Sequence, residues 1–125
     1  MKIFLLCLLC LVAATPAFAQ RHGKTVPKVI TFSAGSATVT GTLTSGREAN
    51  YVFTARKGQT VTIRNPRSRQ FDFRVYNEQF DFETEFESSP TLTFEIPETG
   101  DYLFFVRKKM ASPRTAGFSI TISVK

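Results

Sequence analysis

The sequence FSITISV, residues 118–124, indicates the class of fold, because apolar and hydroxyl-bearing side chains alternate along it. Alternation with a period of two places one set of side chains on each face of a β-strand. Nowhere in the chain do apolar residues recur at helical spacing for three turns. The stretch therefore predicts a half-buried strand with an apolar inner face and an outer face of Ser and Thr.

The same alternation recurs along the rest of the chain, with Gly, Pro and Asn marking turns between the runs. Further strands are expected at residues 37–43, 51–55, 61–63, 71–76 and 92–96, with a short edge strand at 29–32. Residues 102–106 are apolar at every position, which predicts a central strand covered on both faces. Seven or eight short antiparallel strands at regular spacing predict a single all-β sandwich, jelly-roll-like or Greek key.

The N-terminus has the organisation of a cleaved signal peptide. Lys2 is followed by an apolar run over residues 3–12, and Ala17-Phe18-Ala19 is the small-x-small pattern that precedes cleavage. The apolar run is shorter than the roughly 20 residues that span a bilayer. We therefore expect a signal peptide at 1–19, a flexible segment at 20–28 and the sandwich domain at 29–125, with no membrane anchor.

Cleavage of the signal peptide would remove the cysteines from the mature chain. Both cysteines, Cys7 and Cys10, lie within the predicted signal peptide, so the mature chain is expected to have no disulfide. Eleven of the thirteen phenylalanines lie after the predicted cleavage site and are available for the core, and the chain has no tryptophan. The prediction is a periplasmic or secreted domain that is held by its hydrophobic core alone.

Charge is distributed in blocks along the chain. Residues 20–74 carry ten bases and two acids, residues 75–106 carry eight acids and no base, and residues 107–125 carry five bases and no acid. Such blocks create separate electrostatic fields if they lie on different surfaces. Neutralisation across neighbouring strands is an equally good interpretation.

Catalytic chemistry has little support in the sequence. The single histidine, His22, lies in the N-terminal segment, and no glycine-rich phosphate loop is present. Carboxylates at 78–87 could serve glycoside hydrolysis or calcium binding. They alternate with Phe80, Phe82 and Phe86, however, which favours a strand with an acidic solvent face. We expect no enzyme activity, no cofactor and no metal site.

Two basic patches are the remaining candidates for a binding surface. One covers residues 65–74 and the other residues 107–114. Arginines beside aromatic side chains could bind single-stranded nucleic acid, but export makes a nucleic-acid partner a poor expectation. A basic loop without any partner explains the patches equally well.

Three motifs resemble those of the bacterial periplasmic inhibitors of g-type lysozyme. They are YVFTARKGQTV (residues 51–61), FDFRVY (71–76) and EIPETGDYLFFV (95–106). They occur in the order of that family, and the resemblance extends from about Phe32 to Lys125. Bacterial pre-peptidase C-terminal domains share part of the pattern for structural reasons, since a tight glycine turn precedes a tyrosine that enters a central strand.

The resemblance implies a β-sandwich that inhibits a g-type lysozyme by inserting a basic loop into its active-site cleft. A guanidinium suits this task because it is always charged and can form two parallel bonds to a carboxylate. Arg114 matches one family arginine, whereas Met110 stands where another is expected, and Arg47 lies where family members often carry tyrosine. The expected partner-binding residues are Arg47, Arg107, Lys108, Lys109, Met110 and Arg114.

The alternative function is a non-catalytic carbohydrate- or envelope-binding module of the pre-peptidase type, using exposed aromatic side chains and the acidic strand. The oligomeric state is left open by the sequence.

Overall fold

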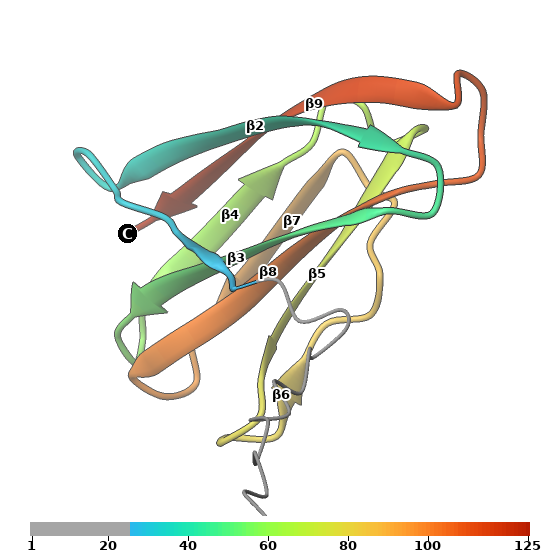
Figure 1. Cartoon of the computed structure of the whole chain (residues 1–125). Coiled ribbons are helices and arrows are strands. Elements are labelled where there is room, and N and C mark those ends of the chain that lie inside the picture. The colour runs from blue at the N-terminus through green and yellow to red at the C-terminus, as the bar shows by residue number, and fades with distance from the viewer. Residues whose placement is uncertain (1–25) are drawn as a thin grey trace, which may run out of the picture.

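The computed structural model describes residues 26–125, which form nine strands in two sheets (Figure 1). The strands are β1 (Lys28–Val29), β2 (Ser36–Thr44), β3 (Glu48–Ala55), β4 (Thr60–Arg64), β5 (Phe71–Asn77), β6 (Phe82–Glu83), β7 (Thr91–Glu95), β8 (Gly100–Lys108) and β9 (Thr115–Val124). The five-stranded sheet has the order β1-β3-β8-β5-β6, and the four-stranded sheet has the order β2-β9-β4-β7.

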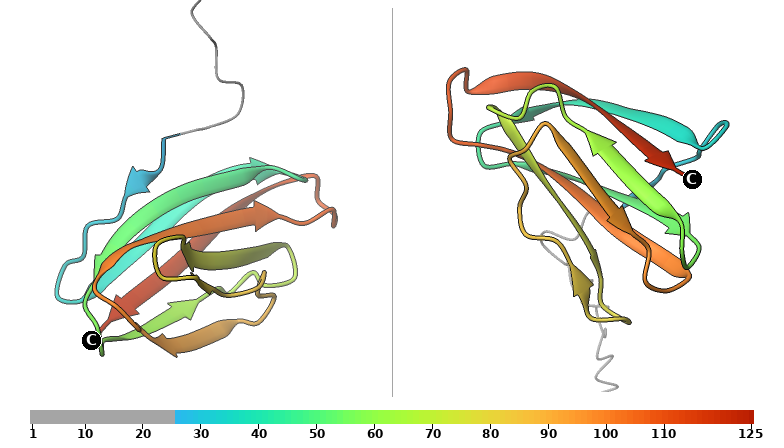
Figure 2. Two further views of the ribbon diagram at one scale, coloured as in Figure 1. Left: turned by 90° about the horizontal axis from the view of Figure 1, so that it is seen from below. Right: turned by 180° about the vertical axis from the view of Figure 1, so that it is seen from behind.

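The two sheets pack as a sandwich, as the two views of Figure 2 show. From β2 to β5 the chain changes sheet at every connection, and among the described strands only β5 and β6 form a hairpin within one sheet. All pairings are antiparallel except that of β1 with β3, which is parallel. The predicted all-β sandwich is therefore confirmed, with one parallel edge strand added.

The strand count agrees with the prediction once length is considered. Seven strands have five or more residues, whereas β1 and β6 have two residues each. The predicted central strand is β8, which is the middle strand of its sheet. Its inward residues are buried, but Leu103 and Phe105 on the outer face are only half-buried. Both cysteines precede residue 26, so no disulfide links the described strands.

The acidic stretch is less regular than the alternation predicts. Only Phe82 and Glu83 form a strand, and one further bridge joins Glu87 to Phe73. Between them the N–H of Val75 donates to the Thr84 hydroxyl at 3.0 Å. In a regular ladder this N–H would donate to a main-chain carbonyl. A side chain thus takes the place of a main-chain acceptor. From Glu83 to Glu87 the chain advances four residues while the partner strand advances three, from Tyr76 to Phe73, so this segment contains a bulge.

Aromatic side chains from both sheets fill the core. Phe71 of β5 meets Phe118 of β9 with ring centroids 5.5 Å apart, and Phe82 meets Phe94 at 5.4 Å. Phe53 and Tyr102 stack at 5.8 Å within the five-stranded sheet. Burial of one such side chain stabilises the fold by about 1.5–3 kcal/mol, so the inner faces can hold the domain without a staple.

The N-terminal predictions fall largely outside this structure. The signal peptide and its cleavage site after Ala19 precede the described residues, as does most of the segment 20–28. The domain begins with β1, where Lys28 pairs with Tyr51 and Val29 with Val52. Within residues 26–125 there is no helix with the length and apolar character needed to cross a membrane.

Candidate functional site

Three loops lie together at the end of the sandwich where β2, β4 and β8 finish, at the right of Figure 1. They are residues 45–47, 65–70 and 109–114, and we call them the basic loop cluster. Lys109 joins two of the loops, because its N–H donates to the Gln70 carbonyl at 2.9 Å and its Nζ donates to the Ser68 carbonyl at 2.8 Å. Sequence-distant segments therefore form one surface.

Main-chain hydrogen bonds tie the turn at 45–47 to the last loop. The N–H of Ser45 donates to the Arg114 carbonyl at 2.7 Å, and the N–H of Gly46 donates to the Lys108 carbonyl at 2.9 Å. The N–H of Lys108 donates back to the Arg47 carbonyl at 2.9 Å. Gly46 has φ +81°, a left-handed conformation that glycine adopts without steric cost. The loops thus hold a defined shape before any partner binds.

Two of the predicted partner-binding residues, Lys108 and Lys109, form part of this framework. Lys108 is fully buried, and its Nζ donates to the carbonyls of Lys109 at 3.0 Å and Ala111 at 2.7 Å. Its ammonium also lies 5.9 Å from the centroid of the Phe71 ring. Lys109 is half-buried, and its Nζ donates to the Ser68 carbonyl. Both cations hold loop carbonyls in place.

Arg107 lies beside the cluster on the outer face of the five-stranded sheet. Its Nε and Nη2 donate to the two carboxylate oxygens of Asp72 at 3.0 and 2.7 Å. Its guanidinium carbon lies 3.7 Å from the centroid of the Phe86 ring. The hydrogen bond to Asp72 raises the pKa of Arg107 above its ordinary value, against a smaller opposing effect of burial. The guanidinium is therefore already paired within the chain.

The remaining three predicted residues are exposed at the cluster. Met110 is 84% exposed, and Arg47 and Arg114 are exposed as well. Neither arginine side chain forms a hydrogen bond or ion pair with another described residue. A Cβ placed on Gly46 would lie 3.6 Å from the sulfur of Met110, so Met110 lies close to the turn that carries Arg47. An apolar side chain and two available guanidinium groups thus occupy one surface.

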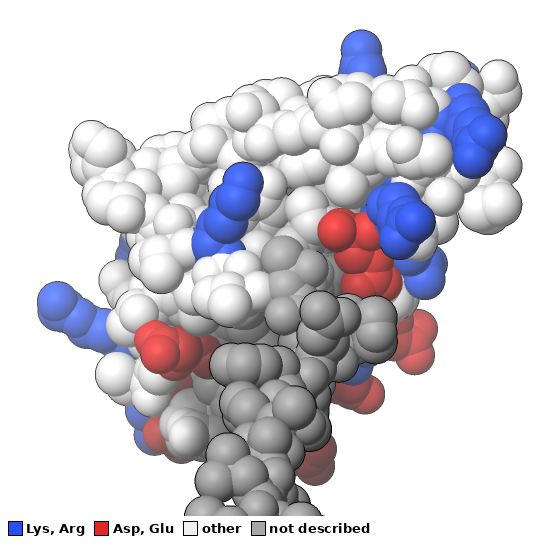
Figure 3. Space-filling view, viewed as in Figure 1, with Lys and Arg blue, Asp and Glu red and all other residues white. Residues whose placement is uncertain are grey.

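Arg67 and Arg69 join the same end of the molecule, which the sequence did not predict. They belong to the other basic patch, and the pairing of Phe71 with Lys108 brings the two patches together. Arg67 donates Nη1 to the Gly117 carbonyl at 2.8 Å, while Arg69 is exposed. Figure 3 shows basic side chains gathered at this end, with acidic ones below them. The register of β5 against β8, which creates this patch, has no signal in the local sequence.

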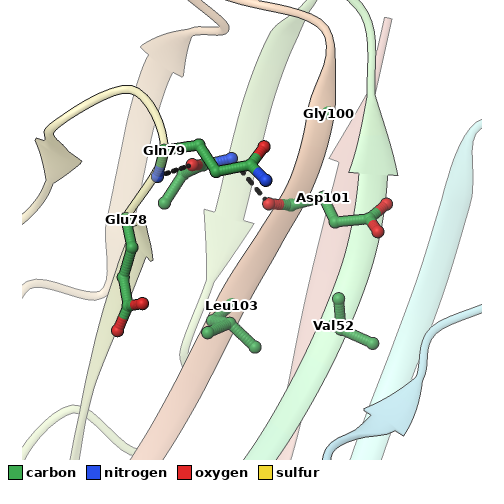
Figure 4. A pocket seen from close by; sticks show the side chains of 7 residues that line it. Val52, Glu78, Gln79, Gly100, Asp101 and Leu103 are labelled. Atoms are coloured by element: carbon green, nitrogen blue, oxygen red, sulfur yellow. Dashed lines mark hydrogen bonds between the residues drawn. The ribbon is translucent and has the colours of Figure 1, made fainter.

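A second surface feature lies at the far end of β8. A shallow hollow of about 410 Å³ lies on the outer face of the five-stranded sheet, between Val52, Leu103, Glu78 and Asp101 (Figure 4). Two of its polar residues are engaged within the chain, because Asp101 accepts from the Thr54 hydroxyl at 2.7 Å and its carbonyl accepts from the Asn77 amide at 2.7 Å. The nearby Tyr76 ring stacks on Phe105 at 5.0 Å and lies 5.1 Å from the guanidinium of Arg74.

Comparison with solved structures identifies proteins that share this fold. The structure of Aeromonas hydrophila PliG, a periplasmic lysozyme inhibitor of g-type lysozyme, matches with a TM-score of 0.66 and 24% identity. That alignment covers 79% of this chain and 96% of the other. Salmonella Typhimurium PliG matches with a TM-score of 0.65 and 19% identity over 81% of this chain and 100% of the other.

A third similarity is more distant. The pre-peptidase C-terminal domain of a collagenase from Bacillus anthracis matches with a TM-score of 0.52 and 14% identity, over 82% of this chain and 100% of the other. No protein-family model matches this chain, and no curated protein matches it in sequence. At these identities the similarities show a common sandwich fold and leave the function to the chemistry of the site.

Proposed function

We propose that this chain is a periplasmic, non-catalytic inhibitor of g-type lysozyme that inserts the basic loop cluster into the active-site cleft of the enzyme. The proposal rests on one observation above all. Arg47, Met110 and Arg114 lie exposed on one surface, and main-chain hydrogen bonds fix the loops that carry them. The fold shared with two PliG inhibitors of g-type lysozyme supports it.

The chemistry of the cluster suits such a target. A glycosidase cleft carries acidic side chains around the scissile bond. Arg114 and Arg47 have no carboxylate partner among the described residues, so binding a cleft carboxylate would break no ion pair formed within them. A guanidinium can form a bidentate bond to a carboxylate. Met110 adds an unbranched apolar side chain that adapts to irregular surfaces.

The fixed loop shape contributes to affinity as well. Ordering a flexible loop on binding costs about 0.5–1.5 kcal/mol for each immobilised side chain, in addition to the backbone cost. Here the main chain of the cluster is already ordered by the bonds of Ser45, Gly46 and Lys108. We further propose that a signal peptide is cleaved after Ala19 and that the domain from 29 to 125 works in the periplasm or outside the cell.

The test is turnover of peptidoglycan by several g-type lysozymes, and by lysozymes of other classes, with the exported chain added in increasing amounts. We expect near-stoichiometric loss of activity for at least one g-type enzyme. Full activity of several such lysozymes in the presence of excess chain would refute the proposal.

A parallel pull-down on peptidoglycan without lysozyme addresses the carbohydrate-binding alternative. That function would use exposed aromatic rings, and among the described residues Phe80 is the one aromatic side chain that is exposed, at 38%. Tyr76 and Phe86 are half-buried and already have stacking partners in Phe105 and Arg107. We therefore expect no saturable binding to the polymer. Saturable binding that persists after substitutions in residues 107–114 would favour the alternative.

A further inference from the structure

The strand β2 is an unusual sheet edge. Exposed strand edges are normally short, charged or interrupted by proline, since unpaired main-chain groups invite pairing with other chains. The edges formed by the other three strands follow this rule. β1 and β6 have two residues each, and β7 is flanked by Pro90 and Pro97 and ends in the charged residue Glu95. By contrast, β2 has nine residues, SATVTGTLT, without charge or proline. The surface along β2 is correspondingly free of charged side chains in Figure 3.

The orientation of the main-chain groups on this edge follows from one bridge. Ser36 both donates its N–H to Ser33 and accepts from the N–H of Ser33, at 3.1 and 2.9 Å, on the side away from β9. Alternate residues of a strand direct their N–H and C=O groups to the same side. Thr38, Thr40 and Thr42 therefore present three donors and three acceptors at the free edge. Among the described residues these groups have no main-chain partner.

A strand added beside β2 would also have an apolar surface to pack on. The five-stranded sheet continues past β3 to β1, while the four-stranded sheet stops at β2. Between the edges of β1 and β2 lies a hollow of about 460 Å³ lined by Lys28, Ile30, Val39 and Tyr51, among others. Thr31 and Ser33, in the chain that connects β1 to β2, also line this hollow. Among the described residues that line it, Lys28 alone is charged.

We propose that this edge binds an extended segment of a partner protein, which adds to the four-stranded sheet as a strand antiparallel to β2. Its main chain would pair with Thr38, Thr40 and Thr42, as in β-strand addition. Alternate side chains of the segment would face Ile30 and Tyr51 and should be apolar. An acidic residue on that face would pair with Lys28. The segment therefore has the chemistry of an acidic, apolar-alternating peptide.

This site is separate from the basic loop cluster. The hollow adjoins the first residues of β2, whereas the loop cluster follows its last residue, Thr44. A lysozyme at the loops and a strand at the edge could therefore bind together, and the edge proposal does not depend on lysozyme inhibition.

The test uses two synthetic peptides that copy β9, the natural neighbour of β2, with Glu or Lys in place of Ile120, the position that pairs with Val39 beside the hollow. Fluorescence anisotropy with the exported chain measures their affinities. We expect the Glu peptide to bind saturably and about twofold to tenfold more tightly than the Lys peptide. Lys28→Glu should reverse that order. Hydrogen exchange at the amides of Thr38, Thr40 and Thr42 should slow when the Glu peptide is bound.

A matched pair of variants tests the role of the main chain. Thr40→Pro removes an N–H that points away from β9, so the fold keeps its ladder, whereas Thr40→Ala keeps that N–H. Thr40→Pro should weaken peptide binding about tenfold or more, and Thr40→Ala should leave it within about twofold. Thermal unfolding checks that both variants are folded. If Thr40→Pro does not fold, the reversal of the charge preference in Lys28→Glu tests the proposal instead. Absence of saturable binding, equal affinity in the two Thr40 variants, or an unchanged charge preference in Lys28→Glu overturns the proposal.

Discussion

Arg107 of β8 holds both carboxylate oxygens of Asp72 on the adjacent strand β5, at 3.0 and 2.7 Å. The carboxylate side is almost enclosed, with 6% exposure of the Asp72 side chain against 37% for Arg107. Phe86 covers the guanidinium at 3.7 Å. The pair therefore joins two strands beneath the bulge of the acidic segment and is a structural contact next to the loop cluster.

Removal of this pair should lower stability. Asp72→Ala leaves the guanidinium without its acceptor and should cost about 1–3 kcal/mol in the free energy of unfolding, less than a fully buried pair because Arg107 is partly solvated. Glu83→Ala is the matched control, since Glu83 pairs with Arg74 but is 65% exposed. It should cost less than about 1 kcal/mol. Chemical denaturation measures both, and equal losses would contradict the structural role of Asp72.

Loss of the exposed arginines should affect inhibition and leave stability unchanged. Arg114→Ala and Arg47→Ala each remove a guanidinium without a described partner, and each should weaken lysozyme inhibition about tenfold or more. Arg56→Ala is the control, because Arg56 is exposed in the turn after β3, at the end of that strand opposite the loop cluster. Inhibition constants and thermal unfolding should be measured together. If Arg56→Ala weakens inhibition as much, net charge and not the loop cluster drives binding.

The buried lysine should behave in the opposite way. Lys108→Met keeps most of the side-chain volume but leaves the carbonyls of Lys109 and Ala111 without their donor. The expected loss is about 1–3 kcal/mol in the free energy of unfolding. Lys57→Met, at a side chain that is 69% exposed, should change stability by about 0.5 kcal/mol or less. Unaltered stability of Lys108→Met would argue against its role as a loop support.

The tyrosines predict a stability limit at alkaline pH. Burial raises the pKa of Tyr51, Tyr76 and Tyr102 above the ordinary value, and it is the largest cause in each case. A folded-state pKa above that of the unfolded chain gives stability that is fully present below about pH 10 and is lost as the pH rises through the folded pKa. Phenolate absorbance should therefore appear at higher pH in the folded protein than in denaturant. Coincident titrations would contradict this.

How far the sequence predicts the structure depends on the range of the interaction. The alternation in residues 118–124 and the apolar run at 102–106 are local signals, and both strands were predicted correctly. The inward series of Tyr102, Phe104 and Val106 continues to Lys108, so the burial of Lys108 could have been read from the same alternation. Its lysine side chain instead suggested a surface role.

Other features have no local signal. The pairing of Phe71 with Lys108 joins two patches that are far apart in sequence, and only strand register decides it. The acidic segment was expected to form a regular strand, but the Thr84 hydroxyl competes with the main chain for the N–H of Val75. The alternating pattern of a strand does not predict whether a Thr hydroxyl will bond to the main chain of the neighbouring strand.

The bonds that tie residues 45–47 to the last loop run between main-chain atoms, apart from one bond of the Ser45 hydroxyl to the Arg114 carbonyl at 3.2 Å. The shape of this end therefore depends little on the identity of the side chains at positions 47, 110 and 114. Sequence drift at those positions can alter what the loops recognise while their geometry persists. The same property makes the three positions natural sites for a randomised library, from which inhibitors with new targets could be selected on an unchanged scaffold.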